Sequence, residues 1–214
     1  MAKNGYASAM RMATVGVSDI YHSLQLFRDI MELKVEREGK VPDTLLSAWG
    51  LGGDASAKFV ELSCKSYHLG RLRLVQFSPE AKERVRIDFG SKNVDSGTDV
   101  GPKALDFYVE DPIGPYVERI ERAGYKFRSA PVRHKIGNTV SEECLFSGPD
   151  GVPILIMVGH VHAATSMRAG SPDGPFSEIP TISVVAGDLD ETRRFYGEGL
   201  GLVAVTDNET PDEY

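Results

Sequence analysis

The chain has 214 residues, of which 41% are hydrophobic, and its formal net charge at pH 7 is −7. This length and apolar content suffice for one or two compact cores. No apolar run approaches the length of a membrane-spanning helix, and the first ten residues lack the continuous apolar segment of a secretory signal. The acidic balance argues against nucleic-acid binding, which depends on clusters of lysine and arginine. The sequence therefore predicts a cytoplasmic protein with neither a membrane nor a nucleic-acid partner.

The first part of the chain, about residues 8–80, has the pattern of a βαβββ module. A β-branched run at residues 13–17 is followed by Asp19, a favourable N-cap residue. Apolar side chains then recur on one helical stripe, namely Ile20, Leu24, Phe27 and Met31. A strand begins near residue 33, and after a long glycine-containing loop two more strands are predicted at 58–64 and 71–77.

A second βαβββ module is predicted at about residues 102–160, after a linker at 88–102 that is rich in Gly, Ser and Asp. Residues 104–109 repeat the opening strand, and Asp111 with Pro112 favours a helix start. Gly124 is expected to end this helix, because glycine readily adopts the left-handed conformation of a helix C-terminus. Strands are predicted near 125–128, 139–146 and 153–158. The two cysteines of the chain, Cys64 and Cys144, lie in such apolar segments and are expected to be buried, reduced thiols.

A third, incomplete module is predicted at residues 179–214, after a proline-containing linker at 163–178. Residues 17–35 and 186–204 align without a gap, and such self-similarity marks a duplicated unit. The matched pairs are Asp19 with Asp188, Leu26-Phe27 with Phe195-Tyr196, and Leu33 with Leu202. We expect residues 1–162 to form one domain of paired modules and the third module, a βαβ unit, to belong to a second domain.

The unfinished third module leaves two interpretations open. Either the chain is part of a longer four-module protein, or strands of another subunit complete the third sheet. Because an unpaired sheet edge invites association, we expect a homo-oligomer.

Four short motifs carry a resemblance to a known superfamily: Val185-Ala-Gly-Asp188, Phe195-Tyr196, Leu200-Gly201-Leu202 and Pro149-Asp150-Gly151. With these motifs the chain resembles the vicinal oxygen chelate superfamily, which includes glyoxalase I, extradiol dioxygenases and bleomycin-resistance proteins. The resemblance implies an α+β fold in which tandem βαβββ modules pair into a cupped mixed β-sheet with helices outside. It also implies a cavity between the sheets for a small organic molecule and, in the enzymes, a divalent metal held by histidine and glutamate.

The metal-ligand positions that the resemblance implies carry other residues in this chain. The histidine position, seven residues before the motif aspartate, is occupied by Met12, Ala104 and Thr181 in the three modules. The glutamate position, four residues after the glycine of Pro-Asp-Gly, is Leu155, and the remaining position lies in the strand 71–77, which has no acid or histidine. These side chains are poor metal ligands, so we expect no metal cofactor. If a divalent metal (Fe, Mn, Zn or Ni) is bound, its ligands are expected among His160, His162, Glu61 and Glu143.

Strand alternation predicts which side chains face the cavity. The candidate ligand-binding residues are Met12, Thr14, Glu61, Arg73, Leu155 and Met157. The candidate catalytic residues are Asp106 as general base in an apolar cavity, Tyr108 as donor to a developing oxyanion, and Glu143 as a second base. Purely structural roles stay open: core filling for Tyr108 and Met157, mutual pairing for Glu61 and Arg73, and a structural hydrogen bond for Asp106.

Two functions are compatible with these patterns. The first is an enzyme of the lyase, isomerase or dioxygenase type that acts on a small aromatic or oxygenated organic molecule by metal-free acid–base chemistry. The second is a non-catalytic protein that sequesters such a molecule. A Gly-rich phosphate loop of the Walker or dinucleotide type and a Gly-x-Ser-x-Gly elbow are absent from the sequence, which leaves phosphate and hydride chemistry unsupported. His22, His68 and His134 are expected on a helix, in a turn and in a basic loop, at the surface.

Overall fold

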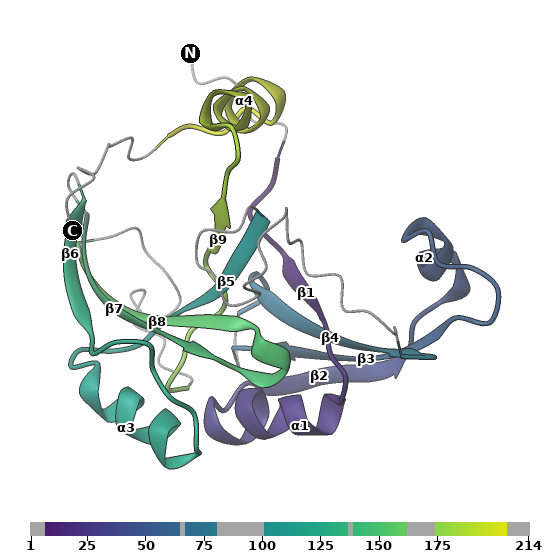
Figure 1. Ribbon diagram of the computed structural model, residues 1–214, viewed down its shortest axis with the longest axis horizontal. Helices are drawn as coiled ribbons and strands as arrows, with labels where there is room; N and C mark the ends of the chain where they lie inside the picture. Colours follow the sequence, from purple (N-terminus) through teal and green to yellow (C-terminus); the bar gives the residue numbers. More distant parts are fainter. Residues whose placement is uncertain (1–6, 65–66, 81–100, 137–138, 162–173, 205–214) are drawn as a thin grey trace.

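Two mixed β-sheets and short helices make up the computed structural model, which describes residues 7–64, 67–80, 101–136, 139–161 and 174–204 (Figure 1). The first sheet has the strand order β1-β4-β3-β2, with β1 (Met12–Gly16), β2 (Lys34–Lys40), β3 (Ser56–Ser63) and β4 (Arg71–Ser78). The second has the order β6-β7-β8-β5-β9, with β5 (Gly101–Tyr108), β6 (Val132–Ile136), β7 (Thr139–Ser147), β8 (Pro153–Val161) and β9 (Ile182–Val185). The predicted α+β fold of tandem βαβββ modules is confirmed.

The helices are short; α1, α3 and α4 follow the first strand of their modules, and α2 follows β2. They are α1 (Ile20–Leu24), continued by the π-helical turn Gln25–Ile30, then α2 (Asp43–Ala48), α3 (Gly114–Arg122) and α4 (Leu189–Arg193), continued by the π-helical turn Arg194–Gly199. A 3-10 turn, Pro149–Gly151, precedes β8. No helix in the described ranges is long and apolar enough to cross a membrane.

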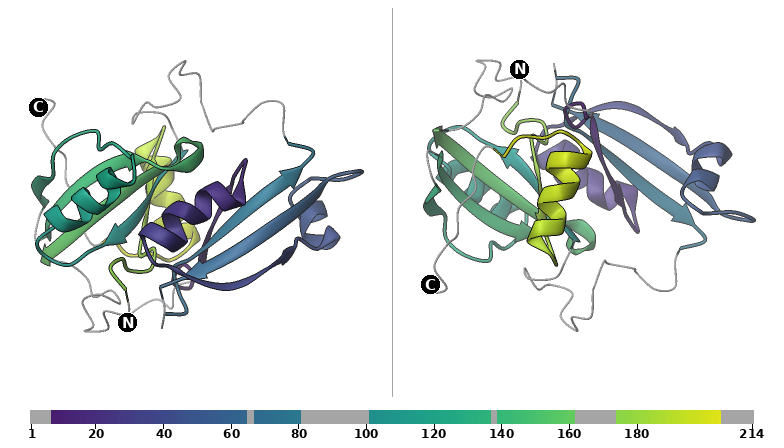
Figure 2. Two further views of the ribbon diagram at one scale, coloured as in Figure 1. Left: turned by 90° about the horizontal axis from the view of Figure 1, so that it is seen from below. Right: turned by 90° about the horizontal axis from the view of Figure 1, so that it is seen from above.

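The two modules share strand pairing and a common core. In each, the first strand runs parallel to the last, so that Thr14 lies opposite Arg73 and Asp106 lies opposite Leu155. Helices α1 and α3 lie on one side of the sheets and α4 on the other (Figures 1 and 2). The apolar strand faces pack against α1 and α3 in one cluster that spans both modules, in which the rings of Phe27 and Phe107 are 6.5 Å apart. Removing these large side chains from water is the main stabilising contribution to such a core.

The third repeat has the same local structure as the first. Asp19 and Asp188 cap their helices in the same way, each accepting a hydrogen bond from a backbone N–H of the first turn. Both helices then widen into a π-helical turn, closed by hydrogen bonds from Met31 N to Leu26 O and from Leu200 N to Phe195 O. Strand β9 of this repeat pairs antiparallel with β5 and extends the second sheet. Residues 202–204 have no strand assignment, so the strand predicted there is wrong over these residues.

Residues 176–183, which we call the bridging segment, connect the two sheets. Phe176 and Ile179 are each 1% exposed in the common core. Ser177 exchanges hydrogen bonds with Tyr108, since its N–H donates to Tyr108 O and its Oγ accepts from Tyr108 N, and Ile179 N donates to Gly70 O. A Cβ at Gly70 would lie 2.4 Å from Ile179 O, so only glycine permits this close approach. The sequence predicts a linker at residues 163–178 from their polar, proline-containing composition. Phe176, within this range, is instead part of the core.

Three local predictions are wrong. Helix α3 begins at Gly114 with Pro115 in its first turn, so Pro115 takes the position predicted for Pro112. The strand predicted at 125–128 is only an isolated bridge between Phe127 and Phe146, and the pairing strand is β6. His134 therefore lies on β6 and not in a loop.

The thiols of Cys64 and Cys144 are buried and are not joined in a disulfide, as expected from their apolar surroundings. Burial, helped by Glu142, Glu143 and Glu121, raises the pKa of the Cys144 thiol to about 12. A thiol with so high a pKa is not a nucleophile at neutral pH, so Cys144 is a structural residue.

Candidate functional site

The polar face of the first sheet brings together the four ligand-binding candidates predicted in the first module. Alternation along the strands, together with the cross-strand register, places them beside one another on the face turned away from α1. These candidates are Met12 and Thr14 on β1, Glu61 on β3 and Arg73 on β4. Two further arginines, Arg37 on β2 and Arg71 on β4, join them.

Glu61 is a buried carboxylate held by two guanidinium groups. Its side chain is 1% exposed and accepts hydrogen bonds from Arg37 at 2.7 and 2.8 Å and from Arg73 at 2.9 and 2.6 Å. Both guanidiniums lie above the ring of Phe59, at 5.3 and 5.7 Å from its centroid. The hydrogen bonds from Arg37 and then from Arg73 lower the pKa of Glu61, against the opposing effect of burial. Glu61 is therefore ionised at neutral pH and is a weak proton acceptor.

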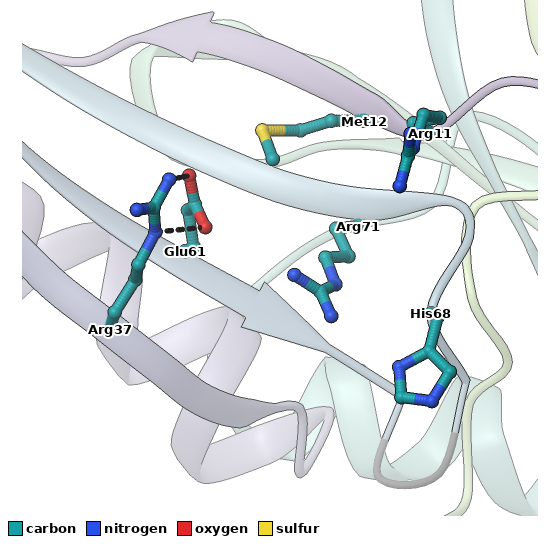
Figure 3. Close-up of a pocket in the computed structure, with 6 residues that line it drawn as sticks. All are labelled: Arg11, Met12, Arg37, Glu61, His68 and Arg71. Carbon is teal, nitrogen blue, oxygen red and sulfur yellow. Dashed lines mark hydrogen bonds and ion pairs between the residues drawn. The ribbon is translucent and has the colours of Figure 1, made fainter.

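A pocket of about 490 Å³ opens beside this ion-pair cluster. It is lined by Arg11, Met12, Arg37, Glu61, His68 and Arg71. Figure 3 shows Arg71 in the middle of this group, between the Glu61–Arg37 pair and His68, with Arg11 above it. The Nε atom of Arg71 is buried and has no hydrogen-bond partner within the described ranges. The pocket is thus rich in guanidinium groups, and Met12 adds an apolar wall.

Sequence reasoning missed Arg11 and Arg37 as pocket residues. The register of β2 against β3 shifts between Val35 and Arg37, which breaks the alternation on which face assignments depend. Arg11 lies just before β1, outside the segment whose periodicity was interpretable. The only available signal was the density of arginine near the strands, which is not specific.

On the second sheet, the face turned away from α3 carries the predicted catalytic and ligand-binding residues of the second module. Asp106 and Tyr108 lie on β5, Glu143 on β7, and Leu155 and Met157 on β8, in register across the sheet. Tyr108, Met157 and Leu155 form a small apolar cluster in which Tyr108 is 1% exposed. Glu143 is partly exposed, and its Oε1 lies 3.6 Å from Nε2 of His134.

Asp106 is a buried carboxylate with hydroxyl partners. It is 3% exposed, and Thr181 Oγ1 donates to its Oδ2 at 2.7 Å, while Ser183 Oγ lies 3.2 Å from the same oxygen. Burial raises the pKa of Asp106 to about 6; the hydrogen bonds from Thr181 and Ser183 oppose this rise and Glu143 adds to it. A carboxyl group with such a pKa exchanges its proton readily near neutral pH.

The two sets of residues lie on different sheets, and the pocket lining includes only the first set. Thr181 lies just before β9 and Ser183 lies in β9. Both cover Asp106 and contribute to its burial. The bridging segment links the two sets through its hydrogen bonds to Tyr108 and to Gly70, the residue before Arg71. The pocket therefore opens over the first sheet, and Asp106 lies outside its lining.

The strand register also places the fourth metal position that the sequence motifs left undefined. Arg73 lies opposite Thr14 as Leu155 lies opposite Asp106, so Arg73 occupies in the first module the place of Leu155 in the second. The four positions of the paired modules thus carry Met12, Arg73, Ala104 and Leu155. A guanidinium repels a divalent cation and the other three offer no hard oxygen or nitrogen ligand, so these residues do not fit the superfamily's metal.

The alternative metal ligands do not converge either. Glu61 is bound by two arginines, and Nε2 of His160 lies 3.7 Å from Glu142, on the face of β7 opposite to Glu143. His162 lies outside the described residues. Across the residues that the structure describes, no three His, Cys, Asp or Glu side chains are grouped so that they could hold a metal ion.

Comparison with known proteins gives the fold. No family model and no curated protein matches the chain, but 135 chains of solved structures do. A glyoxalase family protein from Bacillus cereus is 22% identical with a TM-score of 0.58, and the match covers 74% of this chain and 98% of that protein. A putative dioxygenase from Bacillus subtilis is 12% identical with a TM-score of 0.66, covering 97% of this chain and 59% of the other.

A mutant of glyoxalase I from Zea mays is 19% identical with a TM-score of 0.59, covering 95% of this chain. This chain spans 59% of the maize protein, as it does of the Bacillus subtilis protein. Identities this low show the fold alone. The resemblance predicted from the sequence motifs is confirmed at that level: the chain has the glyoxalase and dioxygenase fold of the vicinal oxygen chelate superfamily.

Proposed function

We propose that the protein is an enzyme that acts on a small oxygenated organic molecule by acid–base chemistry, without the metal of its superfamily. The substrate enters the pocket over the first sheet and extends toward the second sheet, where Asp106, which does not line that pocket, transfers the proton. Tyr108 and Glu143 remain the supporting candidates, as oxyanion donor and second base. The predicted ligand-binding residues Leu155 and Met157 supply the apolar surface next to Asp106.

The observation that carries the proposal is the environment of Asp106. Burial without a cationic partner gives this carboxyl group a pKa of about 6, so both of its protonation states are populated near neutral pH. A general base is most effective when its pKa lies close to the working pH, and such perturbed groups concentrate at functional sites. A protein that only sequesters its ligand needs no group of this kind.

The donor set supports the metal-free part of the proposal. A metal at the superfamily position would meet the guanidinium of Arg73, which is itself fixed by Glu61 at 2.6 Å. Chemistry of the lyase or isomerase type, which begins with removal of a proton next to a carbonyl group, requires only a positioned base and a hydrogen-bond donor.

Solvent deuterium exchange tests this chemistry without knowledge of the product. Metal-stripped protein, with its metal content checked by inductively coupled plasma mass spectrometry, is incubated in D2O with pyruvate, phenylpyruvate and dihydroxyacetone. We expect proton NMR to show protein-dependent exchange next to the carbonyl group in at least one of these compounds. The exchange rate should fall about 100-fold or more in Asp106→Asn, because a general base contributes about 10²- to 10⁴-fold.

The matched control is Asp190→Asn, whose carboxylate is exposed on α4 and should not affect exchange. Exchange that disappears on metal removal, or that persists in Asp106→Asn, contradicts the proposal. Specific ligand binding without any Asp106-dependent exchange would instead support sequestration. We further expect a cytoplasmic location and a homo-oligomeric state, as the sequence predicts.

A further inference from the structure

We propose that the pocket over the first sheet binds the anionic group, a carboxylate or a phosphate, of a small organic ligand, and that Arg71 and Arg11 supply the positive charge. This inference rests on the proposed function in taking the pocket as the substrate site. Anion binding itself depends on neither Asp106 nor turnover. The inference thus adds a substrate class to the proposed function.

The charge balance of the pocket favours an anion. Three of its six lining residues are arginines, and its single carboxylate, Glu61, is already shared by Arg37 and Arg73. Within the described residues, the guanidinium groups of Arg11 and Arg71 take part in no ion pair; hydrogen bonds from Ser63 and Lys34, and last the charge of Arg71, lower the pKa of Glu36. Glu36 is itself bonded to Ser63 and Lys34. Positive charge in the pocket therefore exceeds the negative charge that faces it.

The buried Nε of Arg71 indicates where the anion lies. Nearly all buried polar groups in folded proteins have a hydrogen-bond partner, so the unpaired Nε–H leaves the Arg71 guanidinium, which lines the pocket, in need of one. Arg71 stands between the Glu61–Arg37 pair and His68, with Arg11 on its other side (Figure 3). Both arginines line the same pocket. Guanidinium groups match the oxygens of a carboxylate or phosphate, which arginine binds through paired, charge-assisted hydrogen bonds.

The size and lining of the pocket restrict the rest of the ligand. A volume of about 490 Å³ falls within the range of about 300–1,000 Å³ that is usual for small-molecule sites. Met12 adds the pocket's apolar surface, and methionine adapts well to flat or irregular apolar groups. The fitting ligand is therefore a compact molecule with one anionic end and a short apolar body.

Isothermal titration calorimetry with three matched probes tests the proposal: benzoate, phenyl phosphate and the neutral benzamide, at low ionic strength. We expect at least one of the two anions to bind and benzamide to bind at least about tenfold more weakly. The stronger anion identifies the preferred oxyanion. Affinity should fall with added salt, because exposed charges such as Arg11 are screened.

The variants are Arg71→Gln, Arg11→Gln and the control Arg122→Gln on the outer helix α3. We expect Arg71→Gln to weaken anion binding by about tenfold or more, as for the loss of a charged hydrogen-bond partner. Arg11 is exposed, so Arg11→Gln keeps the fold and should weaken binding by a smaller factor of about three. Arg122→Gln should bind as the parent protein does.

Several outcomes would overturn the proposal: neither anion binds, benzamide binds as tightly as the anions, or the two pocket variants retain the parent affinity. If Arg71→Gln fails to fold by circular dichroism, Arg11→Gln alone decides. Asp106→Asn should keep its affinity for the anion. A protein that binds anions but shows no Asp106-dependent exchange thus refutes the acid–base mechanism and not the anion site.

Discussion

Two buried carboxylates, Glu61 and Asp106, show how partner chemistry decides the state of an acid. Their exposures are nearly equal, at 1% and 3%. Glu61 faces two guanidiniums and its pKa is lowered, whereas Asp106 faces two hydroxyls and its pKa rises to about 6. Hydroxyl groups donate hydrogen bonds but carry no charge, so they offset only part of the desolvation of the carboxylate. Glu61 is therefore fixed as an anion, and Asp106 is free to titrate.

The titration of Asp106 predicts a pH dependence of stability. Its folded-state pKa, about 6, lies above the unfolded value of 3.8, so the folded state binds the proton more tightly. The corresponding stabilisation is fully present below about pH 4 and is lost as the pH rises through 6, a change of about 3 kcal/mol. In urea unfolding at pH 4 to 8, we expect Asp106→Asn to gain stability relative to the parent as the pH rises to about 7. A pH-independent difference would show that Asp106 does not titrate in this range.

The Glu61 cluster predicts unequal effects of its two sides. Glu61→Gln removes the negative charge that two guanidinium groups face. Removing one partner of a largely buried ion pair lowers the free energy of unfolding by about 3 kcal/mol. Arg37→Gln removes a side chain that is 61% exposed, so its expected cost is below about 1 kcal/mol after solvent screening. Urea unfolding of both variants at pH 7 measures the difference. Equal losses would mean that the exposed Arg37 pair accounts for the whole effect and that the Arg73 pair contributes nothing.

At the scale of elements, the sequence predicts what periodicity and capping determine. The stripe of Leu24 and Phe27 and the cap at Asp19 gave α1, and alternation gave the correct faces of β5 and β8. It fails where a distant contact decides. The register shift at Arg37 has no local signal, and the bridging segment is fixed by its bonds to Tyr108 and Gly70.

In the candidate site too, the sequence predicts what strand alternation determines and misses what distant contacts determine. Residues whose position follows from alternation, such as Thr14 and Asp106, were placed on the correct face by the sequence alone. The burial of Asp106 was not predictable, because it depends on Thr181 and Ser183 at β9, more than 70 residues further along the chain. The excess positive charge of the pocket was likewise hidden, since it depends on which arginine Glu61 binds and which it leaves unpaired.

At the scale of the whole molecule, the first and third repeats differ in the burial of their matching apolar side chains. The apolar stripe of the first repeat is buried: Ile20 is 5% exposed, Leu26 0%, Phe27 2% and Leu33 4%. The matching side chains of the third repeat are open to solvent: Leu189 is 55% exposed, Phe195 58%, Tyr196 38% and Leu202 46%. The second module closes over the first repeat, where Ser18 binds Asp150 through two hydrogen bonds, and no described residue does the same for the third.

This difference predicts that the chain self-associates through the exposed face of α4 and the turn that follows it. Burying one large apolar side chain is worth about 1.5–3 kcal/mol, and contiguous exposed apolar patches are typical of protein interfaces. Light scattering coupled to size exclusion should show a particle larger than one chain at micromolar concentration. We expect Phe195→Ser with Leu189→Ser to shift it toward the monomer. Tyr21→Ser, which alters an even more exposed aromatic residue of the first repeat, should have no effect; a strictly monomeric parent protein would refute the prediction.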